Sequence, residues 1–121
     1  MKVKGREIKF LRTVKTNFDI AEICPDKKLE RMDELFPDDS IESLKGMMEF
    51  IMLMNKGYEE AMNYEDPTHE VNVIQKEEMM YMAPETLTEL FQEAVNAFMG
   101  IKQTVEVEPS KSKKKTSVTS D

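Results

Sequence analysis

The feature that most constrains this chain is a nearly continuous apolar run at residues 47–54, MMEFIMLM, in which seven of eight residues are apolar. The run lies inside the longest stretch of helical periodicity in the chain. Asp39 opens that stretch, with Glu42 at capping-box spacing, and Asp66-Pro67 ends it. A helix that is apolar on nearly every side is usually the central helix of its domain. The sequence therefore predicts a fold built around one long helix.

Two apolar stripes run along this helix, and the pattern leaves two uses open for the second. The first stripe is expected to face the core and consists of Ile41, Leu44, Met48, Ile51, Tyr58 and Met62. The second stripe either completes the packing of a central helix, which we favour, or contacts a partner protein. Methionine suits a contact surface because its flexible side chain adapts to different apolar partners. The candidate partner-binding residues are Met47, Phe50 and Met54, extended by Met79, Met80 and Met82.

Shorter periodic segments precede the long helix. Residues 2–11 alternate charged and apolar side chains around Gly5, which predicts a β-hairpin. A helix is expected over residues 14–24, where apolar residues recur every three or four positions until Pro25. Asp26 can cap a second short helix that Pro37 closes, and its apolar residues are Leu29, Met32, Leu35 and Phe36.

The last predicted helix begins at Pro84 and ends at Gly100, with an apolar stripe of Leu87, Leu90, Phe91, Ala94, Val95 and Phe98. Residues 104–107 alternate polar and apolar side chains, so they are a candidate third strand beside the hairpin. Residues 108–121 have almost nothing apolar to bury and are expected to form a flexible tail. We therefore predict one mainly α-helical domain over residues 1–107 with an N-terminal hairpin, which the third strand would make an α+β fold.

The charge distribution excludes several classes of protein. Residues 1–15 carry six basic side chains against Glu7, yet the whole chain has a net charge of -7, so the body of the domain is strongly acidic. Nucleic-acid binding normally requires a basic face that displaces counterions from phosphate, and we do not expect it here. No apolar stretch approaches the ~20 residues of a membrane span, and the first residues do not resemble a secretory signal. We expect a soluble cytoplasmic protein that has no membrane partner.

Cys24 and His69 are the only candidates for a thiol nucleophile and its base. No third orienting group or glycine-rich elbow accompanies them, so Cys24 is better explained as a small buried residue and His69 as a loop residue. No EF-hand pattern or His-x-x-x-His pair is present either. The carboxylates near His69 are expected to form a solvated acidic face: Glu59, Glu60, Glu65, Asp66 and Glu70. The sequence therefore predicts no catalytic site, no cofactor and no metal.

Several short segments stand out in order along the chain. They are Lys4-Gly5-Arg6-Glu7-Ile8 with Phe10, Arg12-Thr13-Val14, Ile20-Ala21-Glu22-Ile23-Cys24-Pro25, Gly57-Tyr58-Glu59-Glu60-Ala61, and Thr104-Val105-Glu106-Val107-Glu108-Pro109-Ser110-Lys111. In this order and spacing the chain resembles the tail assembly chaperones of long-tailed bacteriophages and of prophages in Gram-positive bacteria. The resemblance covers most of the chain.

The resemblance implies a non-enzymatic chaperone that binds the tape measure protein in the infected bacterial cell and is absent from the finished virion. Such a chaperone keeps this long helical client soluble while tail tube subunits assemble around it, so the tail tube protein is a further candidate partner. Self-association is also compatible with the class. Members are often made in two lengths by ribosomal frameshifting. Lys113-Lys114-Lys115 would fit an A-rich slippery site, and a solvated lysine cluster explains these residues equally well.

Two other classes of function stay open. A structural tail component or head-tail connector would be found in purified virions, whereas a chaperone would be missing from them. A small transcriptional or toxin-neutralising regulator would bind DNA or a toxin, and its affinity for DNA would depend strongly on salt.

Overall fold

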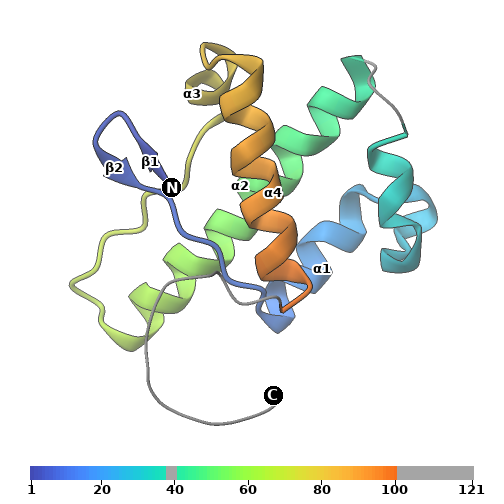
Figure 1. Ribbon diagram of the computed structural model, residues 1–121. Helices are drawn as coiled ribbons and strands as arrows, with labels where there is room; N and C mark the ends of the chain where they lie inside the picture. The colour runs from blue at the N-terminus through green and yellow to red at the C-terminus, as the bar shows by residue number, and fades with distance from the viewer. Residues whose placement is uncertain (38–40, 101–121) are drawn as a thin grey trace, which may run out of the picture.

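The computed structural model describes residues 1–37 and 41–100 (Figure 1). Along the chain the elements are β1 (Lys2–Val3), β2 (Arg6–Glu7), α1 (Val14–Ile23), the 3-10 segments η1 (Pro25–Lys27) and η2 (Leu29–Leu35), α2 (Ile41–Glu65), α3 (Lys76–Met80) and α4 (Pro84–Phe98). The predicted mainly helical fold with an N-terminal hairpin is confirmed. The candidate strand at 104–107 and the tail at 108–121 lie outside the described residues.

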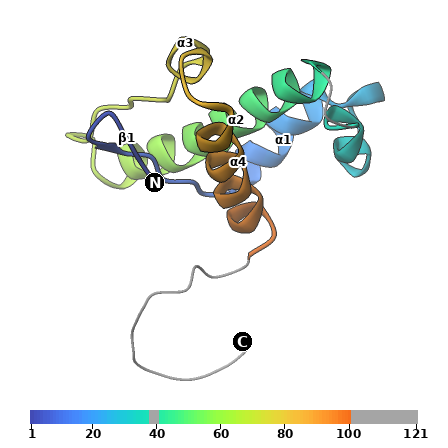
Figure 2. The same ribbon diagram turned by 45° about the horizontal axis from the view of Figure 1, so that its top comes forward.

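The long helix α2 is the central element of the fold, as its apolar run predicts. Helices α1, α3 and α4 and the segment η2 all contact it, and α4 crosses it in both views (Figures 1 and 2). On α2, Phe50 and Met54 are completely buried. The Phe50 ring meets three other rings edge-on, with centroid separations of 5.8, 5.7 and 5.5 Å to Phe36, Phe91 and Phe98. These aromatic contacts join α2, α4 and the end of η2 in one core.

The face of α2 that turns inward differs from the expected one. Ile41 and Leu44 were predicted to face the core, yet they keep 65% and 37% of their surface exposed. Phe50 and Met54, from the second stripe, have no exposed surface. The reason is tertiary, because the Phe36 ring beyond η2 and the rings of α4 pack on the Phe50 side of the helix. Of the expected core stripe, Met48 and Ile51 are buried, and Tyr58 and Met62 are half-buried.

The boundaries of α1 and α4 agree closely with the predicted ones. The Thr13 hydroxyl accepts a hydrogen bond from the Thr16 backbone N–H at 3.0 Å, and the Thr16 hydroxyl accepts one from the Thr13 N–H at 3.1 Å. This reciprocal capping box fixes the start of α1. Pro84 is the first residue of α4, and Gly100 has the positive φ that commonly ends a helix.

The short helix predicted to start at Asp26 is wrong in type. The segment forms the 3-10 turns η1 and η2, and Asp26 lies inside η1 at φ +57 instead of capping a helix. Its carboxylate pairs with the Arg31 guanidinium, which also donates to Glu34 at 2.7 and 2.8 Å. A local ion-pair network therefore replaces the expected cap. The apolar residues still pack against the core as expected: Leu29, Met32, Leu35 and Phe36.

The hairpin is short and is tied to a loop that lies far along the chain. Lys4 and Gly5 at its turn both have positive φ, as a two-residue type I′ turn requires. The Arg6 guanidinium donates to the carbonyl oxygen of Asn72 and forms an ion pair with Glu78, with 3.0 Å between Nη1 and Oε2. The hairpin thus contacts the segment that leads into α3.

The buried side chain of Asn55 joins three parts of the chain. Its Nδ2 donates to the carbonyl oxygen of Lys9 at 2.8 Å, and its Oδ1 accepts from the backbone N–H of Ile74 at 2.7 Å. Asn55 is 1% exposed, so neither backbone partner can be replaced easily by water. One amide group on α2 therefore holds both the N-terminal segment and the loop before α3.

Glu59 and Asn63 continue this polar stripe at four-residue spacing and hold the same loop. One carboxylate oxygen of Glu59 accepts from the Asn72 N–H at 3.1 Å and lies 2.9 Å from Nε2 of His69. The Asn63 amide donates to the His69 carbonyl oxygen at 2.8 Å. Glu59 is only 8% exposed, so its expected place on a solvated face is wrong. The expectation is confirmed for Glu65, Asp66 and Glu70, which are exposed, while Glu60 is half-buried.

The start of α1 approaches α2 closely at Gly57. A Cβ atom at Gly57 would lie 2.3 Å from both the Leu11 carbonyl oxygen and the Thr16 hydroxyl. Next to this contact, the Leu11 N–H donates to the Met54 carbonyl oxygen at 3.2 Å. The approach therefore requires a residue that has no side chain.

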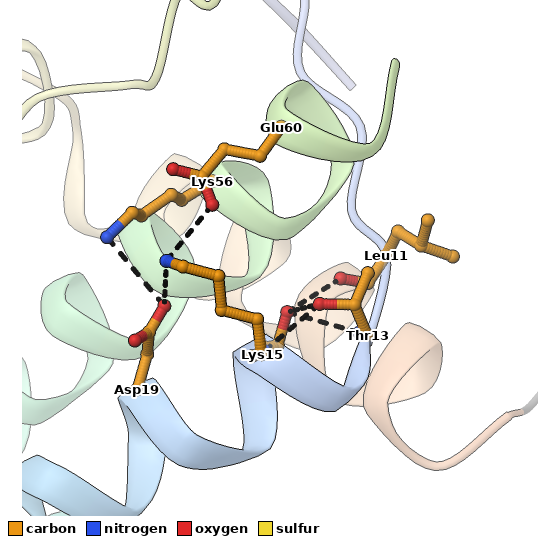
Figure 3. A network of polar contacts seen from close by, with 7 residues as sticks. Leu11, Thr13, Lys15, Asp19, Lys56 and Glu60 are labelled. Atoms are coloured by element: carbon orange, nitrogen blue, oxygen red, sulfur yellow. Dashed lines mark hydrogen bonds and ion pairs between the residues drawn. The ribbon is translucent and has the colours of Figure 1, made fainter. Parts of the chain in front are cut away.

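Ion pairs cover the outer side of the same crossing (Figure 3). Lys15 Nζ lies 3.2 Å from the carboxylates of both Asp19 and Glu60, and Lys56 Nζ lies 3.7 Å from Asp19. Hydrogen bonds to Asp19 and then to Glu60 raise the pKa of the Lys15 ammonium. Since Lys15 is exposed and its partners are only half-buried, these pairs orient α1 on α2 and each adds little to stability.

Replacing Asn55 with alanine should lower the free energy of unfolding by about 2–4 kcal/mol, because two hydrogen bonds are lost and the Ile74 N–H stays buried without an acceptor. Urea unfolding followed by circular dichroism measures the change. Asn96→Ala is the control, since Asn96 accepts from Gln92 at the exposed surface of α4. Equal losses for the two variants would show that Asn55 does not hold the fold together.

Gly57→Ala should destabilise the protein by about 1–3 kcal/mol, because the added Cβ meets a backbone carbonyl that cannot move away cheaply. Alanine otherwise favours a helix over glycine by about 1 kcal/mol, so the steric effect acts against a gain. Lys45→Ala, at an exposed position of α2, provides the control for helix propensity. Differential scanning calorimetry gives both Tm values, and a raised Tm for Gly57→Ala would contradict the close approach of α1.

Candidate functional site

The six residues predicted to bind a partner occupy very different environments. Phe50, Met54 and Met79 are buried, Met47 and Met82 are half-buried, and Met80 is 65% exposed. The three buried residues belong to the core because α3, α4 and η2 pack on α2, and in this fold they cannot contact a partner. Phe50, Met54 and Met79 are therefore corrected from candidate surface residues to packing residues, while Met47 is half-buried. Met80 is the one of the six that lies open to solvent.

Exposed apolar side chains occur instead at the start of α2 and at the end of α3. Ile41 and Leu44 lie in the first turns of α2, and Met80 is the last residue of α3. A groove of about 400 Å³ separates the two helices, and it is lined by Lys45, Met48, Glu49, Lys76 and Met80. Two methionines thus form the apolar part of this groove, and charged side chains form its rim.

A second groove, of about 460 Å³, lies between α2 and η2. Its apolar lining consists of Ile23, Leu35 and Pro37, and its charged lining consists of Glu34, Glu42, Lys45 and Glu49. Gly46 forms part of the wall, and a Cβ there would lie 2.1 Å from the Leu35 carbonyl oxygen. The glycine therefore allows η2 to pack against the first turns of α2 and shapes this groove.

Lys45 and Glu49 line both grooves, so together they form a ridge between them. They are one helical turn apart, and Glu49 also forms an ion pair with Lys76 of α3. We call the two grooves and this ridge the ridge surface. It combines apolar floors with charged edges, which is the composition of a protein-binding site.

Sequence reasoning missed the ridge surface because it assigned the first turns of α2 to the core through Ile41 and Leu44, which line neither groove. A signal was present in the polar residues of the same turns. At 100° per residue, Glu42, Lys45 and Glu49 fall within an arc of about 60°, and Ile41 lies about 40° beyond its edge. Three charged side chains on one arc indicate solvent, even where apolar residues stand between them.

A second exposed apolar stripe runs along the start of α1 and consists of Leu11, Val14 and Phe18. Its neighbouring cations are engaged within the chain. The Arg12 guanidinium stacks 3.8 Å from the centroid of the Phe98 ring and donates to the Phe98 carbonyl oxygen at 3.0 Å. Lys15 pairs with carboxylates on α1 and α2. This stripe therefore offers apolar area with few free charges.

The two residues considered for catalysis do not form a pair in the structure. Cys24 is buried at the C-terminal end of α1, and His69 lies in the loop after α2, where its ring contacts Glu59. Over residues 1–37 and 41–100, no group of three His, Cys, Asp or Glu side chains is placed to hold a metal ion. No helix in these ranges is long and apolar enough to cross a lipid bilayer.

Comparison of the chain with protein-family models, with curated proteins and with solved structures gave no match. The assignment of a function therefore depends on the exposed surfaces described above and on the sequence resemblance.

The Cys24 thiol should react slowly in the folded protein. Burial, together with the nearby charge of Glu30, raises its pKa. At pH 7.5 the reactive thiolate is therefore scarcer than in the unfolded chain, and reaction with dithiobisnitrobenzoate should be at least about tenfold slower. The rate should rise with pH through a midpoint above that of the unfolded protein. A Cys24→Ser, Thr88→Cys variant, with its thiol on the exposed face of α4, should react fast, and equally fast reaction of native Cys24 would contradict its burial.

Proposed function

We propose that this chain is a non-enzymatic tail assembly chaperone that binds the tape measure protein of a long-tailed bacteriophage or prophage. The observation that carries the proposal is the apolar area that the folded domain leaves open to solvent at the ridge surface and along α1. Contiguous exposed apolar area with a polar rim is typical of a protein-binding site. The sequence resemblance supplies the identity of the client.

The chemistry of the exposed area supports a chaperone in particular. Met80 presents a flexible thioether side chain that can adapt to more than one apolar surface, and the buried Met48 lines the same groove. A client that is a long helical chain offers many similar apolar stripes, so an adaptable surface suits it better than a single rigid pocket.

The charge of the domain supports the same role. The chain has a net charge of -7, and acidic side chains surround the apolar area on α2. Like charges keep copies of the protein apart and keep a complex with an aggregation-prone client in solution. In this proposal the chaperone acts in the host cell and is absent from the finished virion, and the tail tube protein is a second candidate partner.

Co-expression with the tape measure protein encoded by the same phage or prophage should raise the soluble fraction of that protein several-fold. The two chains should then co-purify by an affinity tag on the client, because the exposed apolar area of this chain covers apolar stripes of the client. The soluble fraction before and after co-expression, with quantitative mass spectrometry of the eluate, measures both effects. Co-expression with an unrelated acidic protein of similar size is the control.

Purified virions provide the opposing measurement. Mass spectrometry should detect the tape measure protein there and should not detect this chain. Its presence at tail stoichiometry would identify it as a structural component, and salt-sensitive binding to DNA would favour a regulator. Unchanged client solubility without a complex would rule out the chaperone role.

A further inference from the structure

We infer that the ridge surface takes a client helix whose apolar face is flanked by lysine or arginine. The inference rests on the proposed function and specifies the chemistry of the client segment and the place where it binds. It draws on the shape of the two grooves, on their charged edges, and on the partners that those charges have within the chain.

The shape of the surface suits a helix. Lys45 and Glu49 are related as i and i+4 on α2, so their side chains form an inclined ridge with a groove on either side. Helices pack by placing the ridges of one into the grooves of the other. The groove on the η2 side has an apolar floor of Ile23, Leu35 and Pro37, and the groove on the α3 side has Met48 and Met80. A helix lying across the ridge can therefore place apolar side chains in both grooves.

The charged residues at the edges of the ridge surface determine which charge a bound segment should carry. Three carboxylates, of Glu34, Glu42 and Glu49, surround the floor of the η2 groove, and Lys45 is its one cationic lining residue among those described. Glu42 is exposed and has no ion-pair partner among residues 1–37 and 41–100. A carboxylate beside an apolar floor attracts a lysine or arginine that flanks an apolar side chain.

The internal pairing of the other two carboxylates keeps them negative and holds them in place. Glu34 accepts two hydrogen bonds from Arg31, and these bonds lower the pKa of its carboxyl group. Glu49 pairs with Lys76, which lies on the α3 side of the ridge. The η2 side of the ridge is therefore the more acidic of the two, so the cationic residues of the client should lie there.

A second copy of this chain is a poorer occupant. Its most exposed apolar stripe, at the start of α1, has Arg12 stacked on Phe98 and Lys15 paired with Asp19 and Glu60. Lys15 is already neutralised, and the Arg12 guanidinium, although exposed, is held against the Phe98 ring and carbonyl oxygen, so both have less to offer the carboxylates of a neighbouring copy. The net negative charge of both copies opposes their association as well.

Matched variants test the charge and the apolar contact separately. Glu42→Lys reverses a charge at the ridge surface, and Glu85→Lys makes the same change in the first turn of α4, so net charge and helix position are matched. Met80→Ser removes an apolar contact, and Met99→Ser is its control, since both methionines are 65% exposed. Circular dichroism and the Tm of each full-length variant establish that it folds as the wild type does.

Affinity for the purified tape measure protein, measured by biolayer interferometry, should fall about tenfold or more for Glu42→Lys and about fivefold for Met80→Ser, and should change less than about twofold for the two controls. The loss for Glu42→Lys should shrink as salt rises from about 50 mM to about 300 mM. Peptides tiling the client should bind only where lysine or arginine flanks an apolar helical stripe.

Each other outcome has a definite meaning. Wild-type binding with equal affinities for all four variants overturns this inference and leaves the proposed function standing. No wild-type binding overturns both. Binding of acidic client peptides in preference to basic ones also overturns the inference. A concentration-dependent dimer of the wild type that Glu42→Lys abolishes, seen by sedimentation, would assign the surface to a second copy instead.

Discussion

The fold depends on the side-chain amide of Asn55, because it is the buried group that joins two segments which Arg6 otherwise links only by more exposed contacts. The N-terminal hairpin is too short to be stable alone, and the loop before α3 has no regular hydrogen bonding of its own. By accepting from Ile74 and donating to Lys9, Asn55 satisfies backbone groups of both segments inside the core. Glu59 and Asn63 form similar hydrogen bonds further along α2. The helix therefore satisfies backbone groups of the segments that cover it, in addition to packing against their apolar side chains.

The hairpin, α1, α2 and α4 could be predicted well from the sequence, whereas η1 and η2 were expected as an α-helix and α3 was not predicted as a helix. Periodicity, the proline at position 84 and the glycine at position 100 locate α4, and the apolar run locates α2 as the central helix. The apolar residues of α2 could not give its rotation, because they lie on nearly every side of the helix, and the available signal was the arc of Glu42, Lys45 and Glu49. The contacts from α4 and from the end of η2 decide that rotation, and they come from distant parts of the chain. The partner-binding site predicted from the sequence was wrong for the same reason, since it depended on which stripe of α2 faced outward.

Polar residues account for the remaining differences. Glu59 looked like part of an acidic face because four more carboxylates follow it by position 70. Its buried oxygen, however, accepts a hydrogen bond from a backbone N–H that no sequence pattern predicts. The carboxylate of Asp26 could cap a helix, yet it forms an ion pair with the Arg31 guanidinium instead. In both cases a specific partner outweighed a general preference of the residue type.

Methionine serves two ends in this molecule, which explains why composition alone could not locate a binding surface. The unbranched thioether fills irregular gaps in a core, as Met54 and Met79 do, and it equally suits an adaptable contact, as at Met80. Only the position of a methionine in the fold shows which of the two roles it has. Because the ring cluster around Phe50 stays closed while the ridge surface lies outside it, a partner can bind to the folded domain without opening the core. Binding through such a preformed surface costs little conformational entropy in the chaperone, so the ordering cost falls mainly on the client.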